Sequence, residues 1–156
     1  MNQSALLVDT ANIYHTVGKK FNKRKLDYRK LKEQFGASLL YAFGTRIGSE
    51  AKGFIDSLKQ IGYYTKFVYI VPGRSTSLNI DLAITAMTIK SKLSEIILVS
   101  SDRDLTSLVH HLRDSGIRVF VVGCGINKDL KLASDGSLEI SEDLLEDETN
   151  IQTTKE

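Results

Sequence analysis

The segment Ile96-Ile-Leu-Val-Ser-Ser-Asp-Arg-Asp-Leu105 joins an apolar stretch to a run of polar residues. The four apolar residues are typical of a strand that is buried on both faces. The serines and aspartates that follow are the residue types that cap helices. We therefore predict a strand over residues 96–99, a helix over 105–113 that ends before Gly116, and a further strand over 119–122. Strands separated by a helix of this length pair in parallel.

The same alternation covers most of the chain. Further strands are predicted over residues 4–8, 38–43 and 63–71, and further helices over 27–35, 49–61 and 79–90. Long connections with right-handed crossovers place helices on both faces of a parallel sheet. The predicted fold is a three-layer α/β sandwich with a central parallel sheet of about five strands.

Charge divides the 156 residues into two parts. Residues 135–156 hold eight acidic side chains and one basic one, which leaves 20 basic and 11 acidic side chains in residues 1–134. We predict one domain over 1–134 and a partly disordered acidic tail over 135–156, in which 138–140 could add a short edge strand. The basic body favours a polyanionic partner. The acidic tail is either a solvated terminus or a competitor of nucleic acid for that basic surface.

Three features indicate a cytoplasmic protein without a membrane segment. No apolar run approaches the roughly 20 residues that span a bilayer, and residues 1–8 lack the basic start of a signal peptide. The single cysteine, Cys124, has no partner for an internal disulfide, which is typical of a reducing compartment.

Four aspartates stand where parallel α/β sheets bind ligands. Asp9 follows the first predicted strand, Asp102 and Asp104 follow the fourth, and Asp81 is in the first turn of the helix after the third. Ligands bind outside the carboxyl ends of such strands. If the first and fourth strands are neighbours, these carboxylates meet at one edge.

A divalent cation would relieve the repulsion within such a cluster. The apolar neighbours of Asp81, which are Leu78, Ile80, Leu82 and Ile84, make an unpaired carboxylate there costly. Oxygen ligands without thiols or paired histidines suit Mg²⁺ or Mn²⁺. A metal held in this way can activate water and neutralise charge on a phosphodiester.

Each of these residues also has a purely structural interpretation. Asp9 could be a turn former at the end of its strand, and Asn12 a local cap. Asp102 could be only an N-cap. Asp81 and Asp104 could simply favour the positive end of a helix. Only convergence of the carboxylates at one sheet edge would favour the metal site.

Three segments in this order resemble the NYN domain, a family of PIN-like nucleases that includes the bacterial LabA-like proteins. They are Leu6-Leu-Val-Asp-Thr-Ala-Asn12, Asn79-Ile-Asp-Leu-Ala-Ile84, and Ile97-Leu-Val-Ser-Ser-Asp-Arg-Asp-Leu-Thr-Ser-Leu108. The third is the most specific, because it lies between an apolar strand and a helix. The resemblance implies a PIN-like, Rossmann-like sheet and a ribonuclease that depends on Mg²⁺ or Mn²⁺.

The resemblance also implies roles for individual residues. Asp9, Asp81 and Asp102 would face the metal, and Asp104 would complete the acidic cluster. Asn12 would orient a ligand or a water molecule. Ser100 would lie near a phosphate at the helix N-terminus.

The chain departs from the family pattern at three positions. Leu78 stands where a lysine is frequent, Ser101 where glycine is common, and Leu105 where an aromatic residue is usual. The missing lysine bears on substrate contact and catalytic strength. Arg74 or Arg103 could supply the lost positive charge.

A dense basic run follows the first of these segments. It includes Lys23, Arg24 and Lys25, with Phe21 and Tyr28 interleaved. Basic side chains bind phosphate backbones, and aromatic rings stack on bases. The run is therefore either a substrate-binding surface for RNA or a solvated loop and helix face.

The leading hypothesis is an endoribonuclease that hydrolyses RNA through a metal bound by aspartates. The alternative is an RNA-binding or regulatory module with the same fold and weak or no catalysis, and a third is a phosphatase or nucleotidase. A dinucleotide-binding domain is disfavoured because no Gly-x-Gly-x-x-Gly follows the first strand. The expected partner is RNA, and a homodimer is a further expectation.

Overall fold

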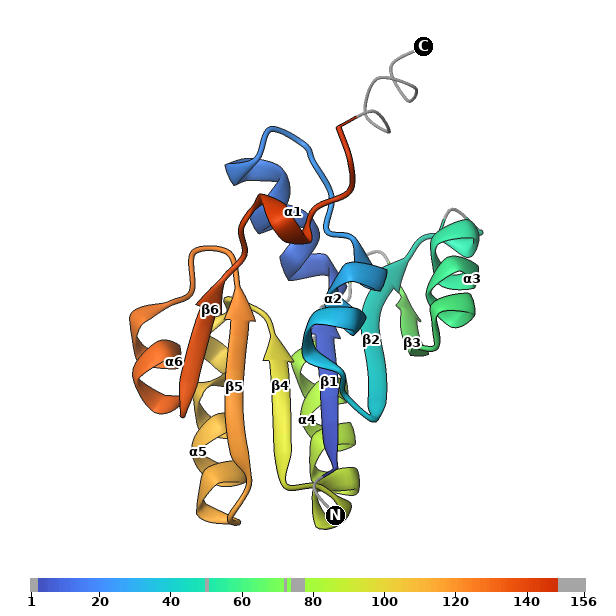
Figure 1. The fold of residues 1–156 in the computed structure, drawn as a ribbon. Coiled ribbons are helices and arrows are strands. Elements are labelled where there is room, and N and C mark those ends of the chain that lie inside the picture. Colours follow the sequence, from blue (N-terminus) through green and yellow to red (C-terminus); the bar gives the residue numbers. More distant parts are fainter. Residues whose placement is uncertain (1–2, 50, 72, 74–77, 149–156) are drawn as a thin grey trace.

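A six-stranded parallel sheet forms the centre of the computed structural model, which describes residues 3–49, 51–71, 73 and 78–148. The strand order is β3-β2-β1-β4-β5-β6 (Figure 1). The strands are β1 (Ser4–Asp9), β2 (Leu39–Arg46), β3 (Tyr64–Tyr69), β4 (Glu95–Val99), β5 (Arg118–Gly123) and β6 (Gly136–Glu139). The predicted α/β class is thus confirmed, with six strands in place of about five.

Helices cover both faces of this sheet. They are α1 (Thr10–Lys20), α2 (Tyr28–Phe35), α3 (Lys52–Ile61), α4 (Leu78–Ile89), α5 (Thr106–Asp114) and α6 (Lys128–Ala133), with short 3₁₀ turns η1 (Lys90–Lys92), η2 (Arg103–Leu105) and η3 (Glu142–Leu144). In Figure 1, α4, α5 and α6 lie on one face and α1 and α2 on the other. No described helix is long and apolar enough to cross a membrane.

Alternate residues of the central strands divide the core into two layers. Leu7 of β1 and Leu98 of β4 pack toward α4 and α5, whereas Leu6 and Val8 pack toward α1 and α2. All four are buried. This alternation follows from the two-residue period of a strand. It leaves the carboxyl ends of β1 and β4 open between the two helical layers.

Helix α1 was not predicted from the sequence. It lies between the strand predicted over residues 4–8 and the helix predicted over 27–35. Asp9 ends β1 and also caps α1, so that the chain passes from strand to helix without a loop. Ile13 and Val17 are buried on the helix face that meets the sheet. Their four-residue spacing is the signal that could have predicted this helix. Gly18 and the lysines that follow weaken the pattern.

The fold continues beyond residue 134, the predicted end of the domain. Strand β6 pairs in parallel with β5, and Ile140, Leu144 and Leu145 are buried in the core layer of α1 and α2. An isolated antiparallel bridge joins Leu145 to Leu26. The first part of the acidic segment therefore packs on the body. Residues 149–156 lie outside the described part of the chain.

Candidate active site

The site is built where β1 and β4 end side by side. Val8 pairs with Val99, so that Asp9 and the turn after Val99 leave the sheet at the same level. Strands β1 and β4 are therefore neighbours, which is the condition for the carboxylates to meet at one edge of the sheet. Asp9 and Asp102 are close enough for electrostatic coupling.

Asp9 is a buried carboxylate with only 5% of its surface exposed. Its Oδ1 accepts a hydrogen bond from the backbone N–H of Asn12 at 3.0 Å, which is the N-cap contact of α1. Burial raises the pKa of Asp9, the Asn12 amide lowers it, and the nearby charge of Asp102 raises it again. The charged form of Asp9 is therefore disfavoured until a positive charge approaches.

Asp102 is held by contacts from three directions. Its Oδ1 accepts the N–H of Asp104 at 2.9 Å, and its Oδ2 accepts the side-chain Nδ2 of Asn79 at 3.0 Å. Its own N–H donates to the Ser100 hydroxyl at 3.2 Å. Helix α4 thus reaches this carboxylate through Asn79, a residue that the sequence did not single out although it stands in the central motif. Asp102 is the N-cap of η2, which confirms the capping interpretation. A carboxylate that caps a helix can also bind a metal.

Asn12 connects α1 to the turn after β4. Its side-chain Oδ1 accepts the backbone N–H of Ser101 at 2.9 Å. These residues are 89 positions apart in the sequence. Asn12 thereby fixes the distance between the helix that Asp9 caps and the turn that carries Asp102.

The turn after β4 is also hydrogen-bonded to Cys124, the residue that follows β5. The Ser101 hydroxyl donates to the Cys124 carbonyl at 2.7 Å and accepts the Cys124 N–H at 3.0 Å. A Cβ on Gly123 would stand 2.8 Å from the Ser101 Oγ, so that only glycine allows this approach. Ser100 is fully buried and its hydroxyl holds the Asp102 amide. In this structure the Ser100 hydroxyl therefore positions Asp102, and a place for Ser100 near a phosphate stays a prediction.

The two remaining aspartates are more peripheral. Asp81 is half-buried, and it forms no hydrogen bond or ion pair with another described residue. Two of its apolar neighbours, Ile80 and Ile84, are exposed, so the expected apolar surroundings of Asp81 are only partly present. Asp104 is exposed. Across the described ranges, no three His, Cys, Asp or Glu side chains form a group that could hold a metal. A metal role for Asp81 and Asp104 stays a prediction.

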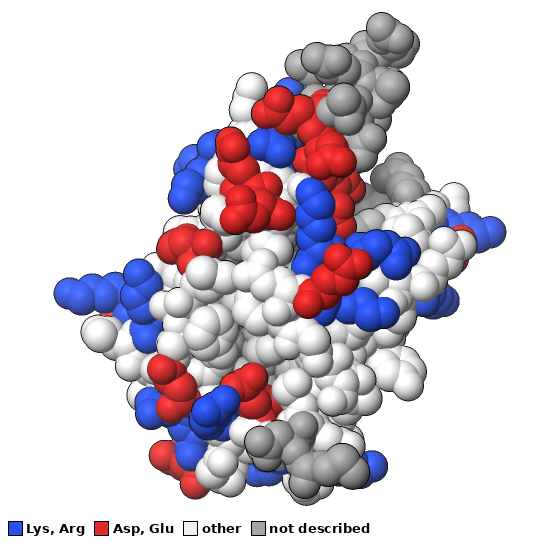
Figure 2. All heavy atoms as spheres, in the orientation of Figure 1, with Lys and Arg blue, Asp and Glu red and all other residues white. Residues whose placement is uncertain are grey.

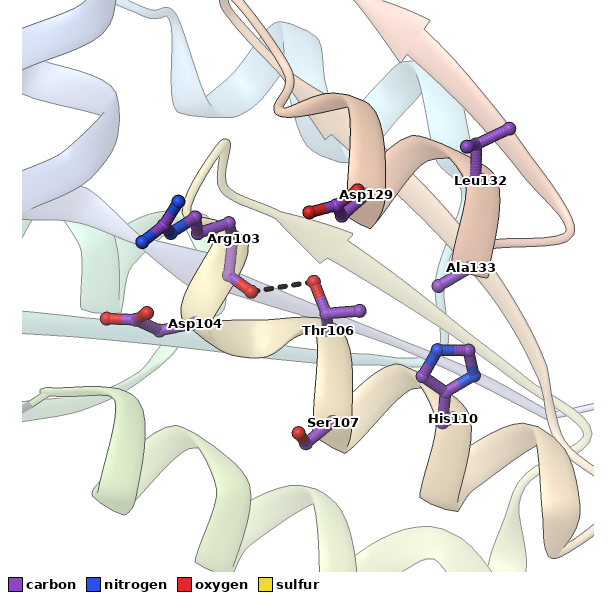
Figure 3. Close-up of a pocket in the computed structure, with 8 residues that line it drawn as sticks. All are labelled: Arg103, Asp104, Thr106, Ser107, His110, Asp129, Leu132 and Ala133. Atoms are coloured by element: carbon purple, nitrogen blue, oxygen red, sulfur yellow. Dashed lines mark hydrogen bonds between the residues drawn. The ribbon is translucent and has the colours of Figure 1, made fainter.

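Arg103 and Asp104 border a separate polar cavity of about 590 Å³ between η2, α5 and α6. Figure 3 shows Asp129 of α6 across this cavity and His110 on α5. The Thr106 hydroxyl donates to the Arg103 carbonyl at 2.6 Å. Neither Asp9 nor Asp102 lines the cavity. It is therefore distinct from the candidate centre, and a substrate contact by Arg103 stays a prediction.

The predicted basic surface is partly covered by the acidic segment. Arg24 lies 3.5 Å from Glu142 and 3.6 Å from Glu148, and Lys30 lies 3.3 Å from Asp147. Figure 2 shows acidic and basic side chains side by side at this end of the molecule. Lys23 and Lys25 are exposed. Arg74, the other predicted substrate contact, lies outside the described residues.

Comparison with known proteins places this arrangement in a family. The model of the NYN domain matches residues 3–141. A protein of unknown function from Vibrio parahaemolyticus, known from its crystal structure, has a TM-score of 0.84 and 20% identity, covering 93% of this chain and 96% of its own. At that identity the likeness concerns the fold. A search of curated proteins gave no match.

Proposed function

Because this chain belongs to the NYN domain family, whose members are generally regarded as nucleases, we propose that it is a metal-dependent ribonuclease. The substrate would be an RNA phosphodiester at the edge where β1 and β4 end. One observation carries the proposal. Asp9, buried at the end of β1, and Asp102, in the turn after the neighbouring β4, leave the sheet at the same edge, and the charge of Asp102 acts on Asp9.

The donors at this edge fit a hard divalent cation. Two carboxylates provide oxygen ligands, and in the described part of the chain neither is paired with a lysine, arginine or histidine. Mg²⁺ is commonly bound by one or two carboxylates and completes its coordination with water and substrate phosphate. The raised pKa of Asp9 also fits a cation site, because a bound cation would favour the charged form of this carboxylate. Asp9 and Asp102 would hold Mg²⁺ or Mn²⁺, with Asp81 and Asp104 as further predicted ligands.

The bound cation would neutralise charge on the phosphodiester and promote attack by water. The chain supplies positioning. Asn79 orients Asp102, and Asn12 holds the Asp102 turn against α1. The backbone amides of Ser101, Asp102 and Asp104 are already engaged by protein acceptors. Positive charge for the phosphate would then come from the cation and from exposed bases such as Lys23 and Lys25.

The decisive experiment is cleavage of a labelled single-stranded RNA with Mn²⁺ or Mg²⁺. The wild-type chain should cleave it, and a chelator should abolish cleavage. Asp9→Asn and Asp102→Asn should each abolish it as well, because each removes one of the two carboxylates on which the proposed metal site depends. Asp114→Asn is the matched control, since Asp114 is an exposed aspartate at the far end of α5.

Cleavage that persists in both Asp9→Asn and Asp102→Asn would refute the assignment and indicate a contaminating nuclease. Loss of cleavage in Asp114→Asn to the same degree would show that the effect is unspecific. Thermal unfolding of each variant separates loss of the site from loss of the fold.

The second candidate is an RNA-binding module with weak or no catalysis. It is favoured by the absence of a three-carboxylate group among the described residues and by Leu78 in place of the frequent lysine. Salt-sensitive RNA binding without turnover over a long incubation would select this function.

A further inference from the structure

A second cavity adjoins the candidate centre on the side of α1 and α2. Its volume is about 490 Å³, within the range of roughly 300–1,000 Å³ that is usual for small-ligand sites. Its walls come from α1, α2, α3, β2, β3 and the segment after η3, and include Thr10, Tyr14, Tyr28, Phe54, Phe67 and Glu146. Thr10 directly follows Asp9. The cavity therefore lies at the same sheet edge as the two carboxylates.

Aromatic rings form a fixed wall of this cavity. The ring of Phe54 lies edge-to-face against both Tyr28, at 5.4 Å between centroids, and Phe67, at 5.9 Å. Tyr14 adds a ring that is 69% exposed. Packed rings of this kind keep their orientation without a ligand. They offer a stacking surface for a planar heterocycle, which is how proteins hold the bases of single-stranded RNA.

Glu146, Lys25 and Tyr28 bring polar groups to the wall of this cavity. The backbone of Glu146 is held at both ends, because its N–H donates to the Lys25 carbonyl at 2.9 Å and its carbonyl accepts Arg24 Nη2 at 3.1 Å. Burial raises the pKa of Glu146, whereas Lys25 lowers it. Burial also raises the pKa of Tyr28, and the nearby charges of Asp9 and Glu146 contribute to this shift. Tyr28 therefore keeps its hydroxyl proton and can act as a hydrogen-bond donor.

We propose that this cavity binds a guanine base of an RNA strand, with the Glu146 carboxylate reading the edge of the base. A carboxylate accepts two hydrogen bonds side by side. Guanine presents two donors in that arrangement, its N1–H and its 2-amino group, next to the O6 acceptor that suits Lys25. Adenine lacks this pattern. The inference rests on the proposed function only in that the phosphate of the same nucleotide region would lie at Asp9 and Asp102.

The test is a titration of the full chain with GMP, IMP and AMP in the presence of a chelator. Binding is monitored by the amide chemical shifts in NMR spectra. No metal and no cleavage are required, so the result is independent of the proposed ribonuclease activity. GMP should shift the amides of Tyr14, Phe54 and Glu146. IMP, which lacks the 2-amino group, should bind more weakly, and AMP weaker still.

Variants locate the site. Phe54→Ala and Tyr14→Ala should weaken GMP binding roughly tenfold, the usual scale for loss of one stacking ring. Tyr64→Ala is the matched control, because Tyr64 is 61% exposed and starts β3 at the opposite end of the sheet. Glu146→Gln should remove the preference for GMP over IMP. Tyr14 is mostly exposed, so Tyr14→Ala tests the site even if Phe54→Ala does not fold.

Three outcomes would overturn the inference. These are equal binding of all three nucleotides, GMP shifts that map outside the cavity, and RNA cleavage by a chain to which GMP does not bind. GMP binding in the cavity of a chain that cleaves no RNA would support the inference and refute the proposed function.

Discussion

Asn12→Ala tests whether α1 and the Asp102 turn are held together as the structure indicates. The substitution removes Oδ1, the acceptor of the Ser101 N–H at 2.9 Å, and Ser101 is only 8% exposed. A buried donor left without its partner costs about 1–3 kcal/mol. In a chain of 156 residues each kcal/mol lowers the Tm by roughly 2–4 °C, so the expected fall is about 2–12 °C.

Calorimetric or fluorescence-based unfolding in a chelator measures this fall. Asn12→Asp keeps an acceptor for the Ser101 amide and should lose less stability than Asn12→Ala when the measurement is repeated with Mn²⁺ in place of the chelator, because the ion compensates the added charge. Gln34→Ala is the control, because Gln34 is exposed on α2 and should change the free energy of unfolding by less than about 0.5 kcal/mol. An unchanged Tm in Asn12→Ala would refute the structural role of this residue.

Three further predictions concern the same edge of the sheet. Because the pKa of Asp9 is raised above its ordinary value of 3.8, the wild type loses stability as pH rises above that value; Asp9→Asn should therefore gain on the wild type as pH rises above about 4 in a chelator, measured by urea unfolding. Asn79→Ala, which releases Asp102, should weaken Mn²⁺ binding by roughly 10–100-fold in calorimetry. Gly44→Ala would bring a Cβ to 2.2 Å from Phe67 Cε2 and should cost about 1–3 kcal/mol, whereas Gly53→Ala, with open space around it, should not destabilise.

Local patterns predicted the elements that position the site. The apolar run before Ser100 and the caps after it are contiguous, so strand β4 and helix α5 follow from the sequence with errors of a residue or two, whereas the 3₁₀ turn η2 was not predicted. The adjacency of β1 and β4 was only a condition of the sequence argument, and the strand order of the structure meets it. The placement of Asp9 and Asp102 depends mainly on these strand ends.

Local sequence patterns could not predict contacts between distant segments of the chain. Asn12 was interpreted from its neighbours as a cap or a ligand-orienting residue, whereas its partner, Ser101, is far along the chain. Asn79 was overlooked because the negative charge of Asp81 dominated the motif. Glu146 reaches the aromatic cavity only because residues 136–145 return along the sheet and across α2, a path that no local pattern in the acidic segment reveals.

The location of Mn²⁺ in a crystal soaked with the ion tests the central proposal most directly. Anomalous density should appear between the carboxylates of Asp9 and Asp102, and Asp102→Asn should lose it. A further ligand from Asp81 would establish that residue as part of the site. Density elsewhere, or none at a concentration that supports cleavage, would contradict the proposal that these two aspartates hold the metal.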